Sequence, residues 1–89
     1  MKVIAMDCRG CVPRSNLHRV FADALAFPDY YGNNLNALYD CLTEIGEDTQ
    51  IQLLYWQAVE EKLGHYAQNA RRAMEDAAEK NPHLEIRFL

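Results

Sequence analysis

The chain has 89 residues, of which 49% are hydrophobic and 25% are charged, and its formal net charge is -4. This composition is typical of a globular domain and excludes a disordered or fibrous chain. No apolar run approaches the roughly 18 residues of a membrane-spanning helix, and the apolar stretch at the N-terminus is too short for a signal peptide. We therefore expect a single cytoplasmic domain over residues 1–89, with no membrane segment.

The first part of the chain predicts a strand, a loop and a helix. Residues 2 to 6, KVIAM, are apolar and partly β-branched, and Gly10 and Pro13 break the segment that follows. Ser15 precedes apolar residues at helical spacing, so we expect it to cap a helix that ends before Pro28. The apolar residues of this helix are Leu17, Val20, Phe21, Ala24 and Leu25.

A turn and a second helix are predicted next. Gly32 with Asn33 or Asn34 can supply a positive φ and a helix cap. The helix that follows is expected to have about 11 residues, from Asn34 to Ile45, and to end at Gly46.

The second half of the chain predicts two more strands separated by two helices. Residues 51 to 56, IQLLYW, are the most continuously apolar, which favours a central strand that ends on Trp56. Residues 57 to 64 can form a short helix, and residues 65 to 80 a longer one that Asn81 and Pro82 stop. Its inward residues are expected to be Tyr66, Ala70, Ala73, Met74 and Ala77.

Apolar and polar residues alternate near the C-terminus, in residues 83 to 89, which predicts an edge strand with one wet face. Strands that alternate with helical crossovers indicate an α/β fold with a parallel sheet. Because sequential strands usually pair, we expect a three-stranded parallel sheet in the order 1-2-3, packed with about four helices.

Charge is distributed unevenly along the chain. Residues 20 to 61 contain eight carboxylates and no Lys, Arg or His, whereas the remainder carries nine Lys and Arg residues and five carboxylates. Such an acidic middle repels nucleic acid and favours a basic partner.

The second predicted helix concentrates this acidity on one face. Its apolar residues Leu35, Leu38, Leu42 and Ile45 share one arc, and Asn36, Asp40 and Glu44 lie opposite. Like charges four residues apart, and an anion near the C-terminal end of a helix, both work against helix stability. A plain solvated face would explain the charges. Bordering tyrosines, at Tyr30, Tyr31 and Tyr39, favour a protein-binding surface instead, although Tyr31 could also be a core residue with its hydroxyl at the rim.

Residues 17 to 43, LHRVFADALAFPDYYGNNLNALYDCLT, resemble the signature of the barstar family of intracellular ribonuclease inhibitors. The residues that carry the resemblance are Leu17, His18, Pro28, Tyr30, Tyr31, Gly32, Asn34, Leu35, Ala37, Leu38, Asp40, Cys41, Leu42 and Thr43. The resemblance implies a barstar-like fold and a non-enzymatic immunity protein whose second helix and preceding loop plug the active site of a small guanyl-specific ribonuclease. The implied partner is a basic extracellular-type ribonuclease or ribonuclease toxin, bound by a monomer without cofactor, metal, nucleic acid or membrane.

The same resemblance implies roles for individual residues. Asp40 would occupy the substrate phosphate site, Tyr30 would pack on the catalytic histidine, and Asp76 and Glu47 would lie at the periphery. With the acidic face of the helix, the expected partner-binding residues are Tyr30, Leu35, Asn36, Tyr39, Asp40, Thr43, Glu44, Glu47 and Asp76.

Four departures from the family pattern bear on the identity of the partner. Asn36 stands where the family usually has an aspartate, Tyr39 replaces a tryptophan, and Ile45 or Gly46 replaces a second one. Lys80 stands where an acid is common. These changes allow a different ribonuclease, or a toxin of another fold, as the target.

A CxxC motif at Cys8 and Cys11 gives an alternative interpretation, a small cytoplasmic dithiol redox protein. In a thioredoxin-like enzyme this motif opens a helix whose N-terminus lowers the pKa of the first thiol. Here Gly10 and Pro13 place it in a loop. The third cysteine, Cys41, is expected to face away from the acidic groups as a packed thiol.

Overall fold

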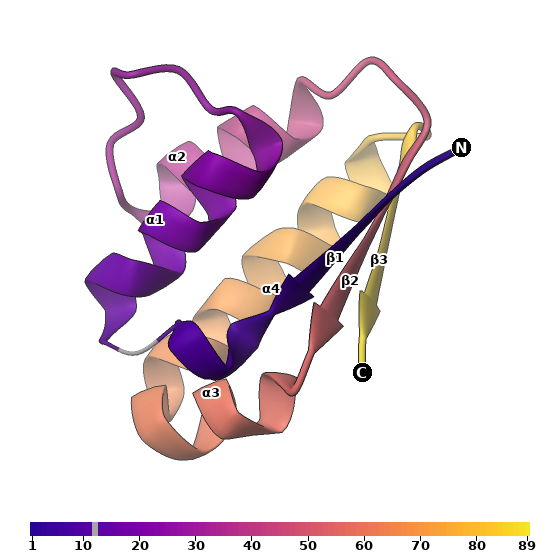
Figure 1. Ribbon diagram of the computed structural model, residues 1–89. Helices are drawn as coiled ribbons and strands as arrows, with labels where there is room; N and C mark the ends of the chain where they lie inside the picture. The colour runs from indigo at the N-terminus through magenta and orange to yellow at the C-terminus, as the bar shows by residue number, and fades with distance from the viewer. Residues whose placement is uncertain (12) are drawn as a thin grey trace.

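The computed structural model describes residues 1–11 and 13–89 and shows one sheet with a layer of helices on a single side (Figure 1). The elements are β1 (Lys2–Asp7), the short 3-10 helix η1 (Cys8–Gly10), α1 (Arg14–Leu25), α2 (Leu35–Thr43), β2 (Thr49–Leu54), α3 (Trp56–Leu63), α4 (His65–Lys80) and β3 (Leu84–Phe88). Both strand pairings are parallel and the strand order is β1-β2-β3. The predicted α/β fold, its strand order and its four α-helices are confirmed over the described residues.

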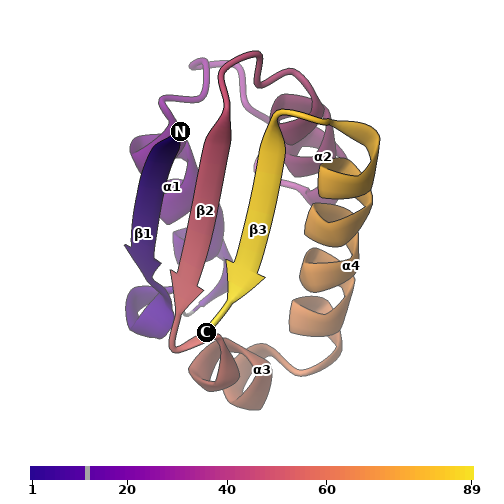
Figure 2. The ribbon, with the colours of Figure 1, turned by 90° about the vertical axis from the view of Figure 1, so that its right-hand side faces the viewer.

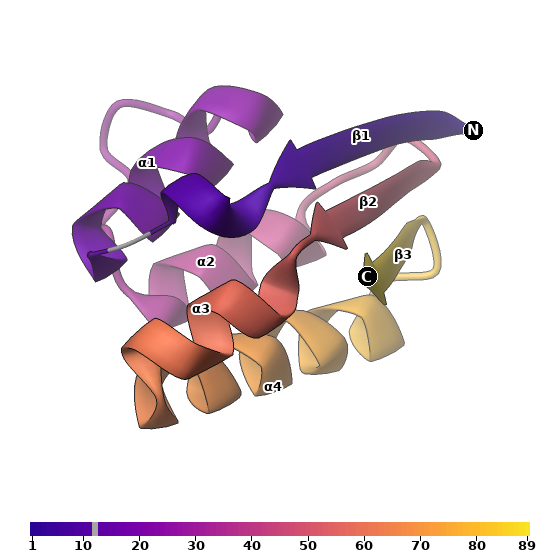
Figure 3. The same cartoon turned by 60° about the horizontal axis from the view of Figure 1, so that its bottom comes forward.

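The two faces of the sheet have different surroundings. Ile51 and Leu53 of the central strand point into the helical layer and are fully buried, whereas Val3 on the other face is 55% exposed. Figure 2 shows that open face in front, with α1 and α2 behind it. In Figures 1 and 3, α2 lies between α1 and α4 in the helical layer.

A ladder of polar side chains covers the open face of the sheet. The Gln52 amide donates to Gln50 Oε1 at 2.8 Å, and the Gln50 amide donates to Glu85 Oε2 at 3.1 Å. Arg87 Nε donates to the other oxygen of Glu85 at 3.2 Å. Hydrogen bonds from Gln50 and then Arg87 lower the pKa of Glu85. Parallel sheets are usually covered on both faces, and this ladder explains how one face remains in water.

The start of α1 differs from the prediction. Pro13 occupies the N-cap with extended backbone and no side-chain cap, so Ser15 is the second helical residue and not the cap. A proline is tolerated at this place because its φ of -69° is compatible with extended backbone and its missing N–H is not needed by the helix. Ala24, from the predicted apolar face, is exposed in the last turn.

The end of β2 also differs from the prediction. The strand stops at Leu54, Tyr55 adopts left-handed backbone with a φ of 61°, and Trp56 begins α3 instead of ending the strand. Trp56 still enters the core, where it is 1% exposed and its ring lies 5.3 Å from that of Phe88. In α4, Ala70, Met74 and Ala77 are buried as predicted, with Ala67 in addition, whereas Tyr66 and Ala73 are half-buried.

The turn before α2 follows the predicted chemistry. Asn33 supplies the positive φ, at 53°, and Asn34 is the N-cap, accepting a hydrogen bond from the backbone N–H of Ala37 at 2.8 Å. Gly32 allows a close approach of the Asn34 side chain, because a Cβ there would lie 3.0 Å from the Asn34 amide nitrogen, which would have to shift. The helix ends at Thr43, two residues earlier than predicted, with Glu44 as its C-cap.

A buried histidine of α1 contacts both the loop before α2 and helix α4. His18 in α1 is 2% exposed, its Nδ1 lies 2.6 Å from the Tyr31 hydroxyl, and its Nε2 lies 2.6 Å from the Tyr66 hydroxyl. A neutral imidazole has one donor and one acceptor, so one tyrosine donates and the other accepts. Tyr31 is thus a buried residue of the core cluster, and burial raises its pKa.

This arrangement predicts a pH dependence of stability. Burial, and then the nearby Arg14, lower the pKa of His18 from its ordinary value of 6.5. Below pH 6.5 the unfolded chain therefore binds more protons than the folded protein, so the contribution of His18 is complete above that pH and is lost as the pH falls toward the folded-state pKa. We expect the free energy of unfolding to fall by up to about 1.4 kcal/mol per pH unit in urea titrations between about pH 7 and pH 5.

The variant His18→Asn should lose this component of the slope even if it is less stable at every pH. His65→Gln is the matched control, because His65 is the exposed first residue of α4. An identical slope in His18→Asn and the unmodified protein would show that His18 is not the titrating group.

Candidate protein-binding site

Helix α2 forms a ridge between two depressions. Asn36 and Asp40 are exposed on its crest, while Leu38 and Leu42 on the opposite side are fully buried. One depression lies between α2 and the loop that precedes it, and the other lies between α2 and α4. The helix that the sequence singles out is thus held by the core along one side and open to a partner along the other.

The first depression is acidic. It has a volume of about 250 Å³ and is lined by Tyr30, Tyr31, Gly32, Ala37, Asp40, Cys41 and Glu44. Two carboxylates and no basic residue line it, and Tyr30, which is 87% exposed, stands at its border. We call it the acidic depression; it brings together three of the predicted site residues, Tyr30, Asp40 and Glu44.

The second depression has mixed charge. Its volume is about 280 Å³, and it is lined by Leu35, Asn36, Tyr39, Asn69, Arg72, Ala73 and Asp76. It contains the predicted residues Leu35, Asn36, Tyr39 and Asp76, so residues from two distant parts of the chain meet in it. Asn69 and Arg72 were not predicted as site residues. Their spacing from Asp76, at seven and four residues along one helix, is the signal that could have revealed them.

Thr43 and Glu47 line neither depression. The Thr43 hydroxyl donates to the backbone carbonyl of Asp40 at 2.8 Å, so it stabilises the last turn of α2. Glu47 lies in the segment between α2 and β2, with a carboxylate oxygen 4.0 Å from Lys2 Nζ. Any contact that Glu47 makes with a partner would therefore compete with an exposed ion pair.

Folding gives some acids of the middle segment a basic neighbour and leaves others without one. Three of its carboxylates acquire a basic neighbour, in the pairs Glu47–Lys2 at 4.0 Å, Asp48–His83 at 2.8 Å and Glu60–Arg71 at 3.8 Å. Within the described residues, the carboxylates of Asp40 and Glu44 form neither an ion pair nor a hydrogen bond. The carboxylates on the acidic side of α2 are thus free to interact with groups outside the protein.

Asn81 fixes the C-terminal end of α2. Its side chain is 4% exposed, and its amide donates to the carbonyls of Leu42 at 3.0 Å and Ile45 at 2.9 Å. The side-chain oxygen of Asn81 accepts from the His83 backbone N–H at 2.9 Å. The sequence predicted Asn81 only as a helix stop, because these partners are distant in the chain.

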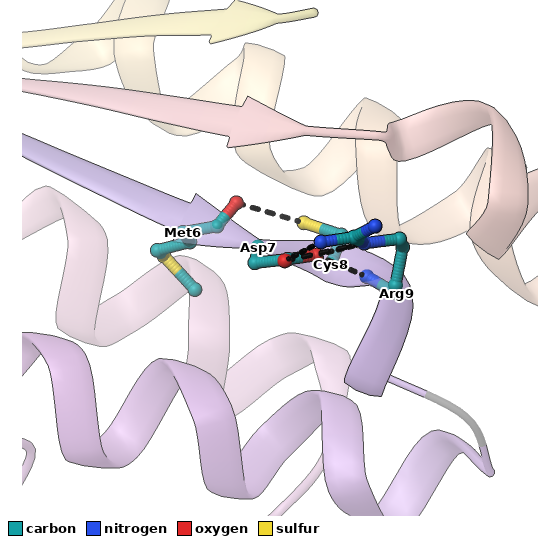
Figure 4. Close-up of polar contacts among 4 residues, drawn as sticks. All are labelled: Met6, Asp7, Cys8 and Arg9. Atoms are coloured by element: carbon teal, nitrogen blue, oxygen red, sulfur yellow. Dashed lines mark hydrogen bonds and ion pairs between the residues drawn. The ribbon is translucent and has the colours of Figure 1, made fainter.

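The CxxC motif begins in η1, directly after β1, and Figure 4 shows its first cysteine, Cys8, with Met6, Asp7 and Arg9. Asp7 accepts from the backbone N–H of Arg9 at 3.0 Å and forms an ion pair with its guanidinium at 2.6 Å, and these contacts lower the pKa of Asp7 to about 2. Cys8 and Cys11 are fully buried, and Cys8 Sγ lies 3.7 Å from the Met6 carbonyl. Contact with Cys11, and then burial, raise the pKa of Cys8. A dithiol catalyst needs an exposed first thiol of low pKa, whereas Cys8 is buried and its pKa is raised. A hydrogen bond from Cys8 lowers the pKa of Cys11, but Cys11 is fully buried as well.

Cys41 lies beside the acidic groups and not away from them, which corrects the prediction. It lines the acidic depression together with Asp40 and Glu44 and is half-buried. Burial, then Glu44 and Asp40, raise its pKa. The reason is that Cys41 follows Asp40 directly and turns toward the loop, between the buried and exposed sides of the helix.

Two further properties of the described residues concern other classes of site. They contain no group of three or more His, Cys, Asp or Glu side chains placed to hold a metal ion. The longest helix, α4, has 16 residues, and none of the helices in the described part is long and apolar enough to cross a bilayer.

A parallel three-stranded sheet under one helical layer, with an exposed acidic helix in that layer, is the architecture that the resemblance implied. The chain belongs to the barstar family: the family described as Barstar (barnase inhibitor) matches residues 1–89. It is also similar to a protein of Bacillus subtilis (strain 168) named "Putative ribonuclease inhibitor YrdF", with 36% identity over 81 residues. The similar region covers 90% of this chain and 89% of the Bacillus protein.

The burial of the cysteines predicts an order of reactivity. With a disulfide reagent such as Ellman's reagent, Cys41 should react first and Cys8 and Cys11 only as the protein opens, because the latter two are fully buried. The variant Cys41→Ala should lack the first phase, which stopped-flow or manual mixing with absorbance detection would measure. A rapid phase that persists in Cys41→Ala would instead indicate a reactive CxxC thiolate and revive the redox interpretation.

Proposed function

We propose that this protein inhibits a small guanyl-specific ribonuclease by inserting the α2 ridge and the loop before it into the active site. The observation that carries the proposal is the exposed Asp40 carboxylate, which has no intramolecular partner among the described residues and sits on a helix fixed at both ends. Membership of the barstar family and the similarity to a named ribonuclease inhibitor support it. The proposed partner is a basic extracellular-type ribonuclease or ribonuclease toxin, and the inhibitor would act as a cytoplasmic monomeric immunity protein.

Inhibition of this kind requires only that the inhibitor bind the active site; the inhibitor need not catalyse a reaction. A ribonuclease must present positive charge where the RNA phosphate binds, and a carboxylate is an anion of similar hydrogen-bonding geometry that the enzyme cannot cleave. In the proposed complex, Asp40 occupies that phosphate position and Tyr30 packs on the catalytic histidine. Glu44 extends the negative charge of the acidic depression, and Asp76 and Glu47 meet basic groups at the periphery.

The state of Asp40 before binding favours such a complex. A carboxylate that is already paired must lose one interaction to gain another, whereas Asp40 loses only water. The α2 backbone is also ordered before binding, since Asn34 caps its first turn and Leu38 and Leu42 are buried. Ordering costs at the interface are thereby reduced, which raises affinity without additional contacts.

Removal of the Asp40 carboxylate tests the proposal directly. Asp40→Ala should weaken the complex with the ribonuclease by about 2 to 5 kcal/mol, because it leaves cationic groups of the active site buried and unpaired. Barnase and other small guanyl-specific ribonucleases would be assayed one at a time with a fluorescent RNA, and affinity with the inhibited enzyme would be measured by calorimetry.

Asp23→Ala is the matched control, because Asp23 is an exposed carboxylate on α1, outside both depressions. It should leave inhibition nearly unchanged. Equal affinities for Asp40→Ala and the unmodified protein would remove Asp40 from the proposed role, and a failure to inhibit any ribonuclease of the set would refute the function.

Association should depend strongly on salt. The free carboxylates of the acidic side of α2 attract a basic enzyme over distances that salt screens, since the Debye length falls from about 10 Å at 0.1 M to about 3 Å at 1 M. Barnase and barstar are themselves an established example of such electrostatic steering. We expect the association rate constant in stopped flow to drop steeply as salt rises, with a much smaller change in the dissociation rate constant. A salt-independent association rate would contradict the electrostatic part of the mechanism.

A further inference from the structure

The two depressions beside α2 differ in a way that a uniformly basic partner does not explain. The acidic depression holds two carboxylates and no basic group. The depression between α2 and α4 pairs one acid, Asp76, with one base, Arg72, and adds the amides of Asn36 and Asn69. The proposed interface is therefore polarised across the ridge, with one negative side and one side of mixed charge.

Arg72 is free to bind a group outside the protein, unlike its neighbour. Arg71 lies 3.8 Å from Glu60 and 3.4 Å from Glu75, and its guanidinium stacks 4.3 Å above the Phe88 ring. Arg72 is exposed and, within the described part of the chain, has no ion pair, hydrogen bond or ring contact. Asp76 lies one turn further along α4 but not within ion-pair distance. An arginine carries five N–H donors and no acceptor.

The residue that α2 contributes to the depression beside Asp76 and Arg72 is neutral. Asn36 lines the same depression from the crest of α2. A carboxylate at position 36 would add a second negative charge to this depression besides Asp76, whereas the Asn36 amide adds a donor and an acceptor and no charge. Arg72, Asn36 and Asn69 together match a planar oxygen acid better than a cation.

We propose that the depression between α2 and α4 binds a carboxylate-bearing segment of the ribonuclease, at the border of its cationic cleft, with Arg72 as the ion-pair donor. This inference rests on the proposed function and adds to it a charge pattern for the partner. The ribonuclease carries positive charge opposite Asp40 and a carboxylate opposite Arg72. Asp76 then contacts a basic group beside that carboxylate.

Reversal of the charge at Arg72 distinguishes the proposed carboxylate from a uniformly basic ribonuclease surface. The two predict changes in affinity of opposite sign. Against a uniformly basic enzyme, Arg72→Glu would remove a repulsive charge and tighten the complex. Against the proposed carboxylate, it should raise the dissociation rate constant by about ten- to a hundredfold, and Arg72→Gln should raise it by less. Surface plasmon resonance with the inhibited ribonuclease would measure both rate constants.

Two further variants complete the test. Arg19→Glu makes the same change in net charge on exposed α1, outside both depressions, and should leave dissociation unchanged. Asn36→Asp adds a carboxylate to the depression that Arg72 lines and should weaken the complex by repelling the partner's carboxylate, whereas a uniformly basic partner would bind it more tightly. Circular dichroism would verify that each variant is folded.

The outcomes distinguish this inference from the function on which it rests. If Asp40→Ala weakens the complex while Arg72→Glu binds equally or more tightly, the carboxylate opposite Arg72 does not exist and the inhibitor function stands. If the unmodified protein inhibits no ribonuclease, the proposed function fails and this inference fails with it. Weakening by Asp40→Ala, Arg72→Glu and Asn36→Asp, with Arg19→Glu unaffected, supports both.

Discussion

The hydrogen bonding of Asn81 to the end of α2 is the interaction on which the geometry of the candidate site depends. The last carbonyls of a helix have no partner within it, and the buried Asn81 amide binds two carbonyls at this end, those of Leu42 and Ile45. Because Asn81 also accepts from the His83 N–H, one side chain couples α2 to the turn between α4 and β3. With Asn34 capping the other end, α2 is held at both ends, and the exposed crest cannot turn without breaking these bonds.

A fixed helix can carry charges that its own stability disfavours. Asp40 and Glu44 are like charges four residues apart, which costs a few tenths of a kcal/mol, and Glu44 faces the negative end of the helix. Burial of Leu38 and Leu42 contributes about 1.5 to 3 kcal/mol each. The hydrophobic contribution is several times larger, so packing decides that the helix forms and leaves its exposed residues open to functional demands. The acids of α2 are therefore not explained by the stability of the helix, which agrees with the proposed role in binding.

The sequence predicted those features that depend on neighbouring residues. Alternation and apolar runs located the strands, and Asn34 with the leucine spacing located α2 within two residues of its ends. The sequence did not predict features that depend on distant residues. The carbonyl partners of Asn81 are 39 and 36 positions away in the chain. Arg72 and Asn36 line one depression only because α4 packs against α2. The left-handed backbone of Tyr55 was not predicted for a different reason. It contradicts the local preference of an aromatic residue and is imposed by the connection from β2 to α3.

Ion pairs elsewhere in the structure reduce the long-range field of the charges that form them. Asp7 is paired with Arg9, Glu85 with Arg87, and Glu75 with Arg71, all within 3.4 Å. A close pair acts at a distance as a dipole, whose field falls off faster than that of a single charge, and salt removes what remains beyond about 8 to 10 Å. An approaching protein therefore senses mainly the carboxylates that have no internal partner, and Asp40 and Glu44 are two of these on one side of one helix. Asp23 on α1 is also exposed and has no ion pair within the described residues, so Asp40 and Glu44 differ from it in lying together, in a depression that no basic residue lines. Their fields therefore add on that side of the molecule.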